Sequence, residues 1–263
     1  MFDITAKKRV VIKLGTSTLT HSTGKLNIRR VEMLVKTIAD LRNHGVDIII
    51  VSSGAIGLGM SKIGLSERPK ETAAKQACAA VGQVDLMYMY DKLFREYGYK
   101  VAQILLTKYV IDTPRSGNVY NTIENLLKYN VIPVVNENDT VAIDELELEV
   151  GENDTLAAYV ALMAKADLLI ILSDIDGFYD GDPSKPGTKL IPVIEEITPE
   201  IELAAGGAGS ALGTGGMATK VKAAKLTNEA GIDLAIINGK NPSALYDLFD
   251  GKPVGTIFLS KAT

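Results

Sequence analysis

The stretch DIIIVSSG at Asp47–Gly54 decides the class of fold that this sequence predicts. Three isoleucines and a valine follow one another with no polar residue between them. Such a run is typical of a strand covered on both faces, because a strand with one face in water alternates apolar and polar side chains. Two serines and a glycine come where this strand ends. We therefore expect a central strand of a parallel sheet whose carboxyl end carries small polar residues.

Further strand patterns lie on both sides of this stretch, and most are separated by a helical pattern. The predicted strands are residues 9–14, 47–52, 100–106, 131–136, 167–172, 233–238 and 256–258, and the predicted helices are residues 27–44, 71–97, 118–129, 154–165, 217–230 and 242–249. Repeated strand–helix–strand units predict an α/β fold, with a mostly parallel sheet between helices. Residues 141–150 break this rhythm, and their short acidic alternation predicts an exposed hairpin or an edge ribbon.

The composition narrows the classes of function. The chain has 263 residues, 46% of them hydrophobic and 23% charged, which is ordinary for a soluble globular protein. Its net charge of −4 argues against a dedicated nucleic-acid-binding protein, and no apolar run approaches the ~18 residues of a membrane helix. Met1–Arg9 lacks the features of a signal peptide.

The single cysteine, Cys78, cannot form an internal disulfide, so we expect a cytoplasmic protein. His21 and His44 lie apart without further cysteines, and we expect no metal site built from side chains.

In sheets of this kind, ligands bind at the carboxyl ends of the strands. That rule selects residues 13–18, 52–59, 136–140 and 173–177, which are polar and rich in glycine. In KLGTS, Lys13–Ser17, a lysine, a glycine that lets the backbone approach a ligand, and two hydroxyl groups suit a phosphate. The alternative is a turn at a strand end with an exposed lysine.

A second pattern suited to an anion is GTGGMATK at Gly213–Lys220, which leads into a predicted helix. Backbone amides at the helix start, hydroxyl groups and Lys220 form an anion receptor. A mobile linker would not require so many glycines before a Thr–Lys pair, so we favour the receptor. SDIDGFY at Ser173–Tyr179 offers a serine and an aspartate that can bind a nucleotide or simply form a turn.

Two similar clusters, NENDT at 136–140 and GENDT at 151–155, follow a predicted strand and open a predicted helix. Asn, Asp and Thr are also the residues of turns and helix caps, and each cluster alone favours a cap. Together they offer amides for a carboxylate and carboxylates for an ammonium group, which is what an amino acid requires. SSGAIGLG at 52–59 can cradle an anion through backbone amides, or pack tightly between a helix and a strand.

Taken in order, seven segments resemble the amino acid kinase family, and the resemblance covers essentially the whole chain. The segments are KLGTS (Lys13–Ser17), VSSGAI (Val51–Ile56), AAVGQ (Ala79–Gln83), NEND (Asn136–Asp139), VGENDTLAA (Val150–Ala158), LSDIDGFY (Leu172–Tyr179) and GTGGMATK (Gly213–Lys220). The resemblance implies one domain, residues 1–263, folded as a three-layer αβα sandwich. It also implies a phosphate-acceptor lobe at about residues 1–165 and a lobe for ATP and Mg²⁺ at about residues 166–263. Some members continue into a small PUA domain, which we do not expect here.

The resemblance also implies roles for individual residues. Lys13 and Lys220 would contact ATP phosphates, and Asp154 would orient these two catalytic lysines. The residues implied to hold the acceptor are Ser53, Gly54, Asp139 and Asn153. The residues implied to bind the nucleotide are Lys13, Ser173, Asp174, Thr214, Gly215, Gly216, Met217, Ala218, Thr219 and Lys220.

The activity implied is phosphorylation of the side-chain carboxylate of L-glutamate by ATP, the first step of proline biosynthesis. KLGTS, VSSGAI and NEND favour glutamate over the substrates of sister kinases, namely N-acetylglutamate, aspartate, carbamate or a nucleoside monophosphate. The alternative from another class is a non-catalytic amino-acid sensor, against which Lys13, Asp154 and Lys220 argue. We expect a homo-oligomer, a dimer or tetramer, and a possible partner in the reductase that consumes glutamyl phosphate, but no nucleic-acid or membrane partner.

Overall fold

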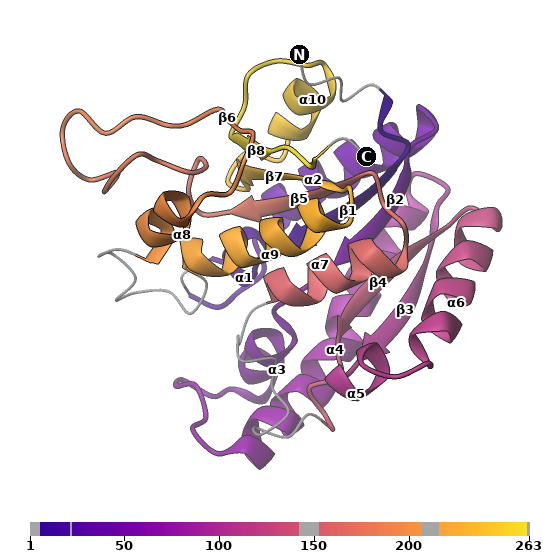
Figure 1. Ribbon diagram of the computed structural model, residues 1–263. Helices are drawn as coiled ribbons and strands as arrows, with labels where there is room; N and C mark the ends of the chain where they lie inside the picture. Colours follow the sequence, from indigo (N-terminus) through magenta and orange to yellow (C-terminus); the bar gives the residue numbers. More distant parts are fainter. Residues whose placement is uncertain (1–5, 22, 142–152, 207–215, 262–263) are drawn as a thin grey trace.

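The computed structural model describes residues 6–21, 23–141, 153–206 and 216–261, which form a sheet of eight strands between two layers of helices (Figure 1). The strands are β1 (Arg9–Leu14), β2 (Asp47–Val51), β3 (Lys100–Leu106), β4 (Val131–Glu137), β5 (Leu168–Ser173), β6 (Val193–Ile194), β7 (Asp233–Asn238) and β8 (Thr256–Phe258). Their order across the sheet is β3-β4-β2-β1-β5-β7-β8-β6. Neighbouring strands are parallel except β7 and β8. The predicted α/β sandwich is confirmed.

Helices cover both faces of this sheet. They are α1 (Thr16–Leu19), α2 (Ile28–Asn43), α3 (Ala55–Ile63), α4 (Thr72–Arg95), α5 (Lys108–Ile111), α6 (Ser116–Lys128), α7 (Asn153–Met163), α8 (Pro199–Gly206), α9 (Met217–Glu229) and α10 (Ala244–Phe249). The core consists of two hydrophobic clusters, one on each face of the sheet. Because successive side chains of a strand point to opposite faces, Val10 and Ile12 of β1 belong to one cluster and Val11 to the other. Helices α2, α4 and α10 cover the first cluster, and α6, α7, α8 and α9 cover the second (Figure 1).

The strand that decides the fold class is central, as predicted. β2 pairs with β1 on one side and β4 on the other, and Ile48 to Val51 are buried. β5 is buried along its whole length. These strands have both faces covered by helices, which is why their sequences are continuously apolar.

Some short elements were not predicted. α1, α5 and β6 have two to four residues each, too few to show a helical or alternating pattern. The predicted hairpin at 141–150 lies, apart from Val141, outside the described residues. Within the described ranges, no helix has the length and apolar character needed to cross a membrane.

Candidate active site

The loops after β1, β2, β4 and β5 and the first turns of α7 and α9 lie at one edge of the sheet. This is the edge where parallel strands end, as the sequence predicted. Lys13 is near the end of β1, Asp154 is the second residue of α7, and Lys220 lies one turn into α9. Lys13 shares the face of β1 that Val11 uses to pack against α7 and α9, because the two residues are two apart on the strand.

These three side chains form a buried cluster in which two ammonium groups share one carboxylate. Lys13 Nζ lies 2.7 Å from Asp154 Oδ1, and Lys220 Nζ lies 3.1 Å from Asp154 Oδ2. The exposed fractions are 8% for Lys13, 0% for Asp154 and 5% for Lys220. The Thr219 hydroxyl group lies within hydrogen-bond distance of Asp154 Oδ2, at 3.1 Å, and of the Gly216 carbonyl oxygen, at 2.8 Å.

The charge state of this cluster follows from its surroundings. Burial raises the pKa of Asp154, but the positive charges and hydrogen bonds of Lys13 and Lys220 outweigh burial and hold that pKa below its ordinary value. Asp154 is therefore ionised at neutral pH. The three side chains of the cluster, two lysines and one carboxylate, together carry a net positive charge. The cluster is suited to an anion that carries several negative charges.

Beside the cluster, Asn153 joins the ends of three elements through its side-chain amide. Asn153 Nδ2 donates to the Ser52 carbonyl oxygen, to Ser53 Oγ at 2.9 Å and to Asn136 Oδ1 at 3.0 Å. Asn136 Nδ2 in turn donates to Gln83 Oε1 on α4 at 3.0 Å. The predicted acceptor residues Ser53 and Asn153 are thus in direct contact, and Asn153 immediately precedes Asp154 in the sequence.

The other two predicted acceptor residues lie on the adjoining loops. Gly54 caps α3 with a φ of 97°, a left-handed conformation that glycine adopts without strain. A Cβ atom at Gly54 would lie 3.8 Å from Thr16 Cγ2, so the loops after β1 and β2 contact each other. Asp139 is half-buried in the turn after β4, three residues beyond Asn136.

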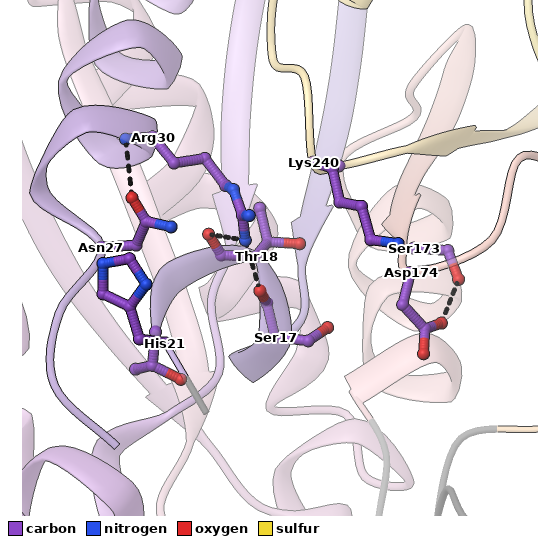
Figure 2. A pocket seen from close by; sticks show the side chains of 10 residues that line it. Ser17, Thr18, His21, Asn27, Arg30, Ser173, Asp174 and Lys240 are labelled. Atoms are coloured by element: carbon purple, nitrogen blue, oxygen red, sulfur yellow. Dashed lines mark hydrogen bonds between the residues drawn. The ribbon is translucent and has the colours of Figure 1, made fainter. Parts of the chain in front are cut away.

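On the other side of β1, Ser173 and Asp174 line a pocket of about 340 Å³ at the ends of β5 and β7 (Figure 2). Ser173 Oγ donates to Asp174 Oδ1 at 3.2 Å, and the side chain of Lys240 extends toward both residues (Figure 2). Arg30 donates to the carbonyl oxygen of Ser17 at 2.7 Å and thereby fixes the opposite wall. The pocket is lined by Ser17, Thr18, Thr20, His21, Asn27, Arg30, Ser173, Asp174, Gly239 and Lys240.

Gly15 connects this pocket with the lysine cluster. A Cβ atom at Gly15 would lie 3.7 Å from Lys13 Nζ and 3.8 Å from Ser17 Oγ. The ammonium group of Lys13 and a hydroxyl group of the pocket wall are therefore separated by little more than the bare backbone of one glycine. An elongated anion can contact both.

The structure describes most of the predicted nucleotide segment. Gly216 is the N-cap of α9, Met217 and Ala218 lie in its first turn, and Thr219 and Lys220 contact Asp154. Thr214 and Gly215 lie outside the described residues. Sequence reasoning assigned no site role to Gln83, Arg30 or Lys240. Asn136 belonged to the NENDT cluster that was predicted to suit an amino acid, and Gln83 fell within the AAVGQ segment, whereas the loop after β7 carried no signal of its own.

Comparisons with known proteins agree with this geometry. Residues 8–238 match the model of the amino acid kinase family. The fold resembles that of carbamate kinase from Giardia lamblia bound to AMP-PNP, with a TM-score of 0.69, 21% identity, and coverage of 98% of this chain and 100% of that one. The chain belongs to the amino acid kinase family, as the seven segments predicted.

Within that family, similar proteins include glutamate 5-kinases. The glutamate 5-kinase of Clostridium perfringens is 50% identical over 258 residues, which cover 97% of this chain and 96% of the relative. The glutamate 5-kinase of Clostridium tetani is 53% identical over 253 residues, with coverage of 95% and 94%. At this identity and coverage, the predicted resemblance is confirmed at the level of the subfamily as well.

Proposed function

We propose that this protein is a kinase that transfers the γ-phosphoryl group of ATP to the side-chain carboxylate of L-glutamate, producing L-glutamyl 5-phosphate and ADP. The observation that carries the proposal is the buried Lys13–Asp154–Lys220 cluster, with its excess positive charge, directly beside the Asn153–Ser53 amide site. Relatives of the same length named glutamate 5-kinase support the choice of glutamate. This activity is the first step of proline biosynthesis.

The chemistry requires no general base, because the attacking carboxylate is already ionised at neutral pH. An oxygen of the glutamate side chain forms a bond to the γ-phosphorus, the bond from that phosphorus to the β,γ-bridging oxygen breaks, and ADP leaves with the electron pair. The obstacle is repulsion, since two unit charges 4 Å apart interact by about 4 kcal/mol at an effective dielectric of 20. Lys13 and Lys220 offset this repulsion and stabilise the charge on the phosphoryl group in transit.

Asp154 holds the two lysines in place without contacting the reacting atoms. Its oxygens are each engaged by one ammonium group. Mg²⁺ enters as part of the substrate, the MgATP complex, bound mainly to the phosphates and to water.

We propose the following division of the site. Ser53, Gly54, Asp139 and Asn153 of the N-terminal lobe, about residues 1–165, hold glutamate. Asp139 supplies a carboxylate for the α-ammonium group, which separates free glutamate from N-acetylglutamate. The C-terminal lobe, about residues 166–263, holds the nucleotide through Ser173, Asp174 and the segment Thr214–Lys220, and part of the nucleotide enters the pocket beside Lys240.

An ADP-release assay with several acceptors tests the proposal. L-Glutamate should release ADP, and hydroxylamine should trap the acyl phosphate as a hydroxamate. N-acetylglutamate, L-aspartate, carbamate and UMP should release little. Turnover with one of these and none with glutamate would assign the protein to a sister kinase. Binding of glutamate without ADP release would assign it to the amino-acid sensors.

The surroundings of the reaction are part of the same proposal. An acyl phosphate is labile, so direct transfer to the reductase that consumes it is favourable. We propose a homo-oligomer, a dimer or tetramer, in the cytoplasm, a location that the single buried thiol of Cys78 supports. Gel filtration with light scattering, and co-elution with the reductase, test these points.

A further inference from the structure

Three side-chain amides from three elements form a continuous relay beside the acceptor site. Gln83 on α4 accepts from Asn136 at the end of β4, and Asn136 accepts from Asn153 at the start of α7, with both bonds 3.0 Å long. Asn136 Oδ1 also accepts from the backbone amide of Glu137 at 2.9 Å. Every amide in the relay has a defined donor and acceptor end. Gln83 and the Glu137 backbone amide therefore act together to orient Asn136, and Asn136 and the Ser52 carbonyl oxygen act together to orient Asn153.

The relay leaves one end of Asn153 available. Its nitrogen has three acceptors, Ser52, Ser53 and Asn136, for two hydrogens, whereas its oxygen Oδ1 accepts from no described residue. The relay therefore presents an acceptor oxygen to the site. An ammonium group is the part of a free amino acid that requires such an acceptor.

Gln83 is held in place by backbone rather than by long side chains. A Cβ atom on the preceding residue, Gly82, would lie 1.8 Å from the Ala55 carbonyl oxygen of α3, and one on Gly59 of α3 would lie 1.8 Å from the Cys78 carbonyl oxygen. The two helices thus touch through their main chains. Since α3 begins next to Gly54, this contact fixes α4 relative to the acceptor loop.

A second contact from the same face of α4 reaches the same loop. Tyr90 is seven residues, about two turns, beyond Gln83, and its hydroxyl group hydrogen-bonds Ser52 Oγ at 2.9 Å. Gln83 Nε2, in contrast, is buried and has no hydrogen-bond partner among the described residues. A buried amide that leaves its donor unsatisfied costs stability, so packing does not explain why glutamine is present there.

We propose that Gln83 is a positioning residue for the acceptor amino acid: acting through Asn136, it holds the Asn153 amide with its oxygen turned toward the substrate. The inference rests on the proposed function, because it assigns a task within the proposed glutamate site. Gln83 itself does not contact the reacting atoms.

A double-mutant cycle tests the relay. Gln83→Met keeps the side-chain length but removes the acceptor for Asn136, and is expected to raise KM for glutamate about fivefold to tenfold while KM for ATP stays within about twofold. Asn136→Ala breaks the relay at the next link and should raise KM for glutamate at least as much. In the Asn136→Ala background, Gln83→Met should have no further effect on this KM.

Two further variants serve as controls, one for lost packing in α4 and one that keeps the acceptor oxygen of residue 83. Leu86→Ala removes buried packing from the same helix without touching the relay, so it should lower the melting temperature and leave both KM values near wild type. Gln83→Glu keeps an acceptor oxygen for Asn136 and should hold KM for glutamate within about threefold of wild type; it carries the test if Gln83→Met does not fold.

Any one of three results would contradict the proposal. The effects of Gln83→Met and Asn136→Ala on KM for glutamate could be independent and additive, or KM for glutamate could be unchanged in Gln83→Met. The third result is a rise in KM for glutamate in Gln83→Glu that is as large as the rise in Asn136→Ala. Failure of the proposed function is a separate result, because the wild-type protein would then show no turnover with glutamate. If a different amino acid proves to be the acceptor, the same cycle is measured with that acceptor.

Discussion

At the scale of single residues, the site depends on two lysines that share one carboxylate. Removing either ammonium group from the Lys13–Asp154–Lys220 cluster leaves Asp154 with a single lysine partner and cancels the net positive charge of the cluster. Phosphate binding would then lack the charge that the transfer requires. This arrangement leads to predictions that separate turnover from folding.

Lys13→Ala and Lys220→Ala are expected to lower kcat by roughly a hundredfold or more, because each removes a donor that stabilises charge in the transition state. Circular dichroism should show an intact fold. Lys222→Ala is the matched control, since Lys222 is exposed and lies two residues beyond Lys220 on the same helix. Near-normal turnover in either cluster variant would exclude that lysine from the reaction.

Asp154 should also influence how stability depends on pH. The positive charges and hydrogen bonds of the two lysines outweigh burial and hold the pKa of Asp154 below its ordinary value. A carboxylate with a lowered folded-state pKa contributes stability above its unfolded-state pKa, and loses that contribution as the pH falls toward the folded-state value. Relative to Asp154→Asn, the wild type should therefore have a constant excess free energy of unfolding from pH 7 to about 5, which shrinks below about pH 4. Urea denaturation of both proteins across this range measures the difference, and an unchanged gap on acidification would contradict it.

Variants of Asp139 and Lys240 test the proposed glutamate half and the proposed nucleotide half of the site separately. Asp139→Ala is expected to raise KM for glutamate about tenfold or more, with a far smaller change for ATP, because it removes the proposed partner of the α-ammonium group. Lys240→Ala should raise KM for ATP several-fold and leave KM for glutamate near wild type. Equal effects on both substrates in either variant would count against the proposed division of the site.

At the scale of elements, the close contact of α3 and α4 is the most specific packing feature beside the site. Gly82→Ala would place a methyl group 1.8 Å from the Ala55 carbonyl oxygen, so the helices must separate. The expected loss is about 2–4 kcal/mol in the free energy of unfolding. Gly117→Ala in α6 is the control, because a Cβ there meets nothing within 4 Å, and replacing a helical glycine should gain roughly 0.5–1 kcal/mol. Similar changes in the free energy of unfolding for Gly82→Ala and Gly117→Ala would show that the contact between α3 and α4 is not tight in solution.

The helices and strands differ in how well the sequence alone predicts them. Buried strands such as β2 and β5 were predictable, because a short and continuous apolar run is typical of a strand covered on both faces. Helix α8 carried an overlooked signal: Thr198 precedes Pro199 and Glu200, a common helix start, and Glu202 donates its backbone amide to the Thr198 carbonyl oxygen. The two-residue strand β6 had no such signal, since its pairing with β8 depends entirely on tertiary structure.

For the site, local patterns identified segments but not their contacts. Lys13 and Lys220 were predicted as anion ligands from KLGTS and GTGGMATK, and the resemblance implied that Asp154 orients them. Gln83 could not be placed, because its partner Asn136 lies 53 residues further along the chain and on a different element. Lys240 has no motif around it, and it was found only because β7 ends beside β5.

At the scale of the whole molecule, the sites proposed for the acceptor and for the nucleotide lie on either side of β1. Because the buried cluster carries excess positive charge in the absence of ligands, MgATP should stabilise the fold more than its contacts outside the cluster would. At one hundred times its dissociation constant, a ligand adds about 2.7 kcal/mol to the free energy of unfolding. We expect a clear rise in melting temperature with MgATP for the wild type and a much smaller one, at the same MgATP concentration, for Lys220→Ala. Equal rises in melting temperature for the two proteins would show that nucleotide binding does not depend on the cluster.

The two lysines come from distant parts of the chain, one on β1 and the other on α9. A ribosome has therefore made most of the polypeptide before the second ammonium group exists. Before α9 is made, the growing chain contains Lys13 and Asp154 but not Lys220, so we expect shortened chains that end before α9 to lack one of the two ammonium groups that the proposed transfer requires.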